Sequence, residues 1–223
     1  MSIKNEPYNS QSETMYDLLT RLFPINRSIT GNGVRVTLQI IKEHLTELQI
    51  LSAPSGAKAF DWDVPLEWNI RSARLTDSKG NVIVDFKQSN LHVVSYSEPV
   101  DKYLSLEELE PHLHSLPKQP LAIPYVTSYY KRTWGFCLPD KTRKELKKGN
   151  YYAKIDSTLE SGCLNYGELV IPGISKKEVF ISTYICHPSL ANNELSGPIV
   201  TTFLAKWIND LKQRKYTYRI IFI

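Results

Sequence analysis

The sequence has little cysteine and no long apolar run. Its 223 residues include only Cys137, Cys163 and Cys186, whose spacing fits neither a zinc cluster nor an even set of disulfide partners. The first residues lack the apolar core of a secretory signal, and no apolar run reaches the length of a membrane span. These absences argue against a disulfide-stapled scaffold, and they predict a cytoplasmic protein that makes no use of a membrane.

A strong charge of one sign is also missing. The formal net charge is +4, and the basic residues are scattered along the chain. The densest cluster, Lys141–Gly149, is more typical of a solvated helix face than of a nucleic-acid site. With 42% hydrophobic and 22% charged residues, the composition is that of a globular protein. We therefore expect no nucleic-acid partner.

Both ends of the chain have an α/β pattern. Apolar stripes predict one helix that stops at Pro24 and a second helix over Val34–Leu48. The apolar run Glu178–Cys186 is typical of a strand buried on both faces of a parallel sheet. A helix that opens at Ser196 and a strand over Tyr216–Ile223 complete a βαβ unit. The predicted fold class is α/β, with a mostly parallel sheet.

The middle of the chain looks β-rich. From Leu51 to about Asp156, short aromatic and β-branched runs alternate with turn signals. Gly80 lies in a predicted hairpin turn, and Ser105 with Glu108 has the spacing of a capping box for a short helix over 105–116. The predicted domains are N-terminal helices (1–50), an inserted β-rich domain (51–160) and an α/β core that stops incomplete (161–223).

Metal-capable side chains follow the Glu178–Cys186 strand. In open α/β sheets, sites form at the carboxyl ends of the strands, where His187 stands. The loop through Asn193 and Glu194 would line the same crevice. Histidine is the commonest zinc ligand, and a carboxylate often completes a zinc site. A histidine at a strand end is about as often a hydrogen-bonded loop residue, so the spacing alone leaves both interpretations open.

Other residues suggest weaker candidates. Cys186 precedes His187, but neighbours along a strand point to opposite faces, so we expect a buried thiol rather than a catalytic dyad. Arg27 could bind a substrate carboxylate, although such an arginine more often pairs with a structural acid. Two aromatic groups could contact a sugar or peptide, or form the core of the β-rich module, which we favour. These groups are Asp61, Trp62, Asp63 and Trp68, and Tyr125, Tyr129, Tyr130 and Trp134.

The stretch "HPSLANNELSG" (187–197) resembles the metal loop of the di-zinc aminopeptidase superfamily, the group around aminopeptidase Y and the glutaminyl cyclases. That loop has a His, an Asp two residues later, and an Asp-Asn-x-Ser-Gly element before a helix. The phrases "FPINRSITGNGVR", "FDWDVPLEWNIR", "IPYVTSYY" and "WGFC" are similar to a bacterial aminopeptidase-like branch with an inserted β-rich domain. The resemblance spans nearly the whole chain.

The resemblance implies one or two zinc ions and hydrolysis of an N-terminal peptide bond or a related amide. His187 matches the first zinc-binding histidine. Asn193 stands where the superfamily has its bridging Asp, and Ser189 where it has the Asp that orients the first histidine. Glu194, beside the expected position, could replace the missing carboxylate ligand.

The superfamily's other ligands and its general base would lie beyond Ile223. We therefore expect no catalytic residue in this chain and no activity from the chain by itself. The partners implied are a peptide or small amide substrate, with a homo-oligomer as a further option. The alternative function is a non-catalytic binding or accessory protein on a degenerate peptidase scaffold, which the departures at Asn193 and Ser189 favour.

Overall fold

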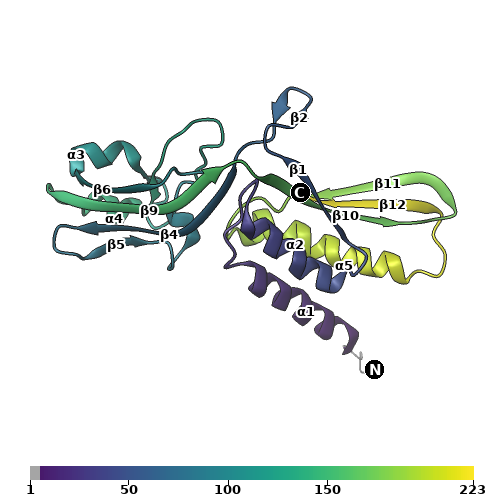
Figure 1. The fold of residues 1–223 in the computed structure, drawn as a ribbon. Helices are drawn as coiled ribbons and strands as arrows, with labels where there is room; N and C mark the ends of the chain where they lie inside the picture. The colour runs from purple at the N-terminus through teal and green to yellow at the C-terminus, as the bar shows by residue number, and fades with distance from the viewer. Residues whose placement is uncertain (1–5) are drawn as a thin grey trace. The chain divides into compact units, whose positions relative to one another are not determined.

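The computed structural model describes the backbone of residues 6–223 and the side chains from residue 14 onward (Figure 1). The chain divides into two compact units. One unit combines the residues up to Ala53 with Cys163–Ile223, and the other consists of Pro54–Gly162. None of the helices in the described part of the chain is long and apolar enough to cross a membrane.

The first unit is a four-stranded sheet with helices. Its helices are α1 (Glu6–Leu22), α2 (Asn32–His44) and α5 (Ser196–Asp210), and a π-helical turn, η3 (Ala191–Leu195), leads directly into α5. Its strands are β1 (Gln49–Pro54), β10 (Cys163–Ile171), β11 (Ser175–Thr183) and β12 (Tyr216–Phe222), in the order β1-β10-β12-β11. β12 is parallel to β11 and antiparallel to β10. The predicted α/β class is confirmed, with a mixed sheet.

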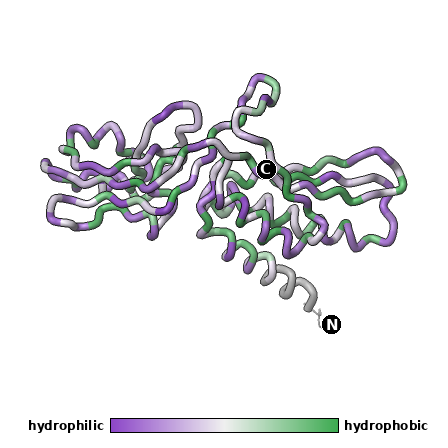
Figure 2. The backbone as a smooth tube through the Cα atoms, in the orientation of Figure 1, coloured by the Kyte–Doolittle hydropathy of each residue, from purple (hydrophilic) through white to green (hydrophobic). Residues whose placement is uncertain are grey.

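Helices α2 and α5 cover one face of this sheet (Figure 1). Buried side chains of both helices join those of β10 and β12 in one cluster, and α2 packs through the apolar stripe that the sequence predicts. For α5 the expected stripe of Val200, Leu204 and Trp207 is wrong, because these side chains are exposed and Ala205 and Ile208 pack on the sheet instead. Figure 2 shows hydrophobic positions along these helices and strands. Helix α1 packs separately, with Leu18 and Leu22 against Leu195 and Ile199 at the start of α5. The start of α5 therefore packs on α1, while its later turns pack on the sheet.

Strand β11 differs from its prediction. It lies at the edge of the sheet, and most of its residues are exposed. Phe180, at 63% exposure, shows that the expected burial of both faces is wrong. The physical reason is that the helices of this unit cover one sheet face only (Figure 1). The strand also ends at Thr183, three residues before the predicted end at Cys186.

The second unit is built on an antiparallel sheet of β4 (Glu67–Asp77), β5 (Val82–Asp85), β6 (Val100–Ser105) and β9 (Asn150–Glu160), in the order β5-β4-β9-β6. Its smaller strands are β2 (Lys58–Ala59), β3 (Trp62–Asp63), β7 (Leu113–His114) and β8 (Phe136–Cys137). Its short helices and turns are η1 (Asn90–His92), α3 (Leu106–Leu109), η2 (Glu110–His112) and α4 (Asp140–Lys144). The predicted hairpin joins β4 to β5, and Gly80 adopts a φ of 85° there.

The structure confirms most of the local predictions for this unit. The Ser105 hydroxyl accepts the Glu108 amide, and the Glu108 carboxylate accepts the Ser105 amide, so the capping box is confirmed. Helix α3 ends at Leu109, well before the predicted end, and a 3-10 turn that contains Pro111 follows it. Trp68 is buried and donates to the Ser97 carbonyl at 2.9 Å, as the core interpretation expects.

Candidate metal centre

The candidate site lies where β11 gives way to α5. The Ile185 amide still donates to the Ile223 carbonyl at 2.5 Å, after which the chain leaves the sheet. In the π-helical turn η3, the amides of Glu194 and Leu195 both donate to the Leu190 carbonyl, at 2.9 and 3.1 Å. A π turn inserts an extra residue into a helix and often occurs at functional sites. The Glu194 side chain is buried in this turn, at 0% exposure.

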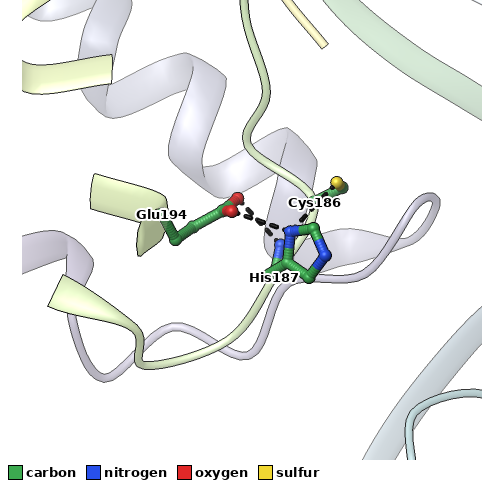
Figure 3. A group of neighbouring side chains, drawn as sticks. All are labelled: Cys186, His187 and Glu194. Atoms are coloured by element: carbon green, nitrogen blue, oxygen red, sulfur yellow. Dashed lines mark hydrogen bonds and ion pairs between the residues drawn. The ribbon is translucent and has the colours of Figure 1, made fainter. Parts of the chain in front are cut away.

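His187 and Glu194 form a two-point contact. The His187 amide donates to Glu194 Oε1 at 2.8 Å, and His187 Nδ1 lies 2.7 Å from Glu194 Oε2 (Figure 3). The Tyr184 ring packs edge-on against the imidazole, with 5.5 Å between ring centroids. The Tyr184 hydroxyl also donates to the Asn193 carbonyl at 3.1 Å. Backbone and ring contacts together fix the orientation of His187.

The Cys186 sulfur approaches the same ring nitrogen, with 3.3 Å between Sγ and His187 Nδ1. The ligand atoms of Cys186, His187 and Glu194 all lie within 4.8 Å of one another. The prediction that Cys186 and His187 point apart is wrong, because both residues follow the end of β11, where strand alternation no longer applies. Hydrogen bonds to Cys186 and Glu194 raise the pKa of His187 to about 10, while burial opposes the shift.

Arg27 brings a positive charge close to this group from the loop between α1 and α2. The residue is fully buried, and its Nη1 donates to the Leu22 carbonyl at 2.6 Å. Burial lowers the pKa of Arg27 to about 10, while the negative charge of Glu194 and Cys186 acts in the opposite direction. The guanidinium therefore stays protonated at neutral pH, within electrostatic reach of the site. Its predicted role toward a substrate carboxylate stays a prediction.

The loop that carries Arg27 depends on a close backbone approach. A Cβ atom at Gly33 would lie 1.8 Å from the Asn26 carbonyl oxygen, so only glycine fits at the start of α2. At the other side of the site, a Cβ atom at Gly197 would lie 2.5 Å from the Thr183 hydroxyl. These two glycines let α2 and α5 come close to the segments that hold the site residues.

The two positions that depart from the superfamily pattern have other contacts. The Ser189 hydroxyl donates to the Phe23 carbonyl at 2.8 Å, which ties the loop to the end of α1. Asn193 is exposed, and its carbonyl accepts the Tyr184 hydroxyl. The carboxylate that contacts His187 comes from Glu194. Of the predicted ligands, the structure brings His187 and Glu194 together, and the role of Asn193 stays a prediction.

Cys186 is the residue that sequence reasoning assigned elsewhere. Its position next to His187 indicated a possible contact, but strand alternation predicted that the two side chains point to opposite faces. The resulting donor set of sulfur, imidazole nitrogen and carboxylate oxygen matches the ligand types of zinc. The residues present therefore fit a zinc ion.

A family model described as "Domain of unknown function (DUF4910)" matches residues 16–223. The chain belongs to the DUF4910 family. It is 50% identical over 221 residues to a Clostridium acetobutylicum protein named "Putative polysaccharide biosynthesis protein with aminopeptidase-like domain". The match covers 98% of the DUF4910 chain and 50% of that relative. The chain thus spans about half the length of this relative.

Solved structures place the DUF4910 chain among aminopeptidase folds. A crystal structure described as a "putative peptidase" from Clostridium acetobutylicum has a TM-score of 0.92 at 49% identity, covering 98% of this chain and 52% of that one. A zinc aminopeptidase from Bacillus subtilis gives 0.58 at 10% identity, over 94% and 60% of the two chains. A peptidase M28 precursor from Shewanella amazonensis gives 0.57 at 12%, over 96% and 64%. At these low identities, the last two likenesses show the fold alone.

Proposed function

We propose that this DUF4910 protein belongs to a zinc-dependent, aminopeptidase-like hydrolase that acts on an N-terminal peptide bond or a related amide. The observation that carries the proposal is the contact of His187 with the buried Glu194 carboxylate at the carboxyl end of β11. The names of the similar Clostridium acetobutylicum protein and crystal structure support a peptidase-like activity, and the fold of zinc aminopeptidases supports the choice of metal.

In this proposal, His187 and Glu194 hold the metal and Asn193 is a further candidate ligand. Bound zinc would polarise the substrate carbonyl and lower the pKa of a water molecule, which is the attacking group in such hydrolases. Glu194 fixes the backbone and ring of His187, and the Tyr184 ring limits movement of the imidazole. Arg27 offsets the negative charge of Glu194. We assign no general base within this chain and propose that it is inactive by itself.

Metal analysis tests the proposal. We expect stoichiometric zinc in the purified full-length protein and in this chain, and loss of that zinc in His187→Ala. His44→Ala is the matched control, because His44 lies at the end of α2 and belongs to no ligand group in the described residues. A protein free of zinc, with the same thermal stability before and after His187→Ala, would refute the metal site.

A second candidate is a non-catalytic binding protein on the same scaffold. Two neutral residues favour it, since Ser189 and Asn193 stand where the superfamily has acidic residues, and Ser189 contacts Phe23. Activity of the full-length protein decides between the candidates. Zinc-dependent release of a chromophore from aminoacyl anilides favours the hydrolase, whereas bound zinc without turnover of any aminoacyl amide favours the binding protein.

A further inference from the structure

We propose that the Cys186 thiolate is a zinc ligand, so that Cys186, His187 and Glu194 form one sulfur–nitrogen–oxygen site. The inference rests on the proposed metal site, but it assigns a ligand that the superfamily pattern does not contain. It also makes the occupancy of the site depend on the state of a single thiol.

The geometry carries this assignment. Figure 3 shows the sulfur and the carboxylate approaching Nδ1 of His187, while the other ring nitrogen points away from both. Neighbouring ligands of a tetrahedral zinc ion are roughly 3.3–3.6 Å apart, given bonds of about 2.0–2.3 Å. The sulfur and Nδ1 are already 3.3 Å apart, and Nδ1 and the carboxylate 2.7 Å. To admit zinc, the histidine and the carboxylate must move apart, and the sulfur and the carboxylate, which lie within 4.8 Å of each other, must reach the same ligand spacing.

Charge also favours the assignment. A thiolate and a carboxylate bring two negative charges to a largely buried place, which is costly unless cations balance them. The buried Arg27 supplies one positive charge, and two of its donor atoms, Nε and Nη2, have no hydrogen-bond partner in the described structure. Zinc supplies two more positive charges, so that cations outnumber anions in the loaded site. Binding releases to solvent the thiol proton and the proton shared by His187 and Glu194.

The assignment also bears on the neutral Asn193 in the loop. Where the superfamily uses Asp to neutralise its metals, this chain has Asn193, whose amide carries no charge. A thiolate next to His187 adds a second negative charge to that of Glu194. Thiolate ligands suit zinc well and magnesium or calcium poorly. We therefore expect the site to select zinc, and cobalt(II) as its spectroscopic substitute, over magnesium.

The experiment is a cobalt(II) titration of this chain, followed by absorbance. We expect a sulfur-to-cobalt charge-transfer band in the near ultraviolet in addition to the visible bands of bound cobalt. Cys186→Ser should lose the charge-transfer band and bind cobalt at least about tenfold more weakly. Cys163→Ser is the matched control and should keep the band, because Cys163 is a partly buried thiol of β10 hydrogen-bonded to Asn165.

A second measurement needs no variant. Alkylation of the wild-type chain by iodoacetamide forms a carbon–sulfur bond and releases iodide and the thiol proton. Peptide mapping by mass spectrometry then gives the rate at each cysteine. We expect zinc to slow alkylation of Cys186 at least tenfold and to leave Cys163 unchanged, and alkylated Cys186 to abolish zinc binding.

The outcomes separate the two proposals. Bound cobalt with no charge-transfer band, and no zinc protection of Cys186, would show metal held without sulfur and would overturn this inference alone. Failure of the wild-type chain and the full-length protein to bind either metal would overturn the metal site itself. Loss of the band in Cys163→Ser but not in Cys186→Ser would also contradict the assignment.

Discussion

His187 Nδ1 lies 2.7 Å from the Glu194 carboxylate, and that carboxylate is entirely buried. The contact joins the end of the sheet to the first turn before α5. The negative charge of the same carboxylate also acts on the buried Arg27 and favours its protonated form. Glu194 therefore links a partly exposed histidine to a fully buried arginine, and its charge stabilises both.

Removal of Glu194 should destabilise the chain. Glu194→Ala leaves Arg27 as a buried cation without its neighbouring anion, which typically costs about 3 kcal/mol in free energy of unfolding. The control is Glu43→Ala, which breaks the exposed ion pair with Arg21 and should cost about 0.5 kcal/mol or less. Urea denaturation of the metal-free chain measures both, and equal losses would contradict the role given to Glu194.

Gly33 should tolerate no side chain. Gly33→Ala places a Cβ atom against the Asn26 carbonyl, so the loop that holds Arg27 must shift, with an expected cost of about 3 kcal/mol. Gly80→Ala is the comparison, because Gly80 has a positive φ but open space around it and should cost about 1 kcal/mol. Thermal melts of both variants test whether Gly33→Ala is the more destabilising change. A larger loss of stability in Gly80→Ala would show that the loop at Asn26 shifts at little cost.

The three cysteines should differ in reactivity. Burial raises the pKa of Cys137 to about 12, and the side chain is fully buried. At pH 8 its alkylation in the folded chain should be at least about 100-fold slower than that of Cys163, since the thiolate is the nucleophile. All three cysteines should react alike in guanidinium. Rapid labelling of Cys137 in the folded chain would be incompatible with this core.

Acid should weaken the β-rich unit through His114. Burial, then Arg143 and His112, lower the pKa of His114 below its ordinary 6.5 in the folded chain. Below about pH 6.5 the unfolded chain therefore binds this proton more readily, and the free energy of unfolding falls until the pH passes the folded pKa. His114→Gln should have a shallower decline between pH 7 and 5, measured by denaturation at each pH. If the free energy of unfolding of the wild type and of His114→Gln fell in parallel with pH, His114 would be excluded as a cause of the acid sensitivity.

The exposed edge strand should promote self-association. β11 presents Phe180 and neighbouring apolar side chains at the edge of the sheet, an arrangement that favours pairing with another chain. Sedimentation velocity should show association that increases with concentration and weakens in Phe180→Lys. Phe60→Lys is the control, because Phe60 is fully exposed in the other unit. A monomer at all concentrations would contradict the expectation.

Local signals in the sequence predicted local structure. The helix start at Ser196, the capping box of Ser105 and Glu108, and the turn at Gly80 all lie where the sequence placed them. In each case the residues that determine the structure are within a few positions of one another. The pairing of His187 with Glu194 belongs partly to this class, because the two residues are seven positions apart.

The contacts that complete the site come from distant parts of the chain. The Ser189 hydroxyl reaches the carbonyl of Phe23, 166 positions away, and the charge of Arg27 in the first loop interacts with that of Glu194. Hydrophobic periodicity in the sequence cannot predict such contacts, because they depend on how α1, α2 and α5 pack together.

The amino-acid sequence alone was enough for the α/β class, the helix that opens at Ser196 and the presence of His187 and Glu194 at a strand end. Tertiary structure decided that β11 ends early and lies at an edge, that Cys186 turns toward His187, and that Arg27 is buried beside Glu194. Side-chain direction after a strand end follows from packing around the loop, and alternation along a strand cannot specify it.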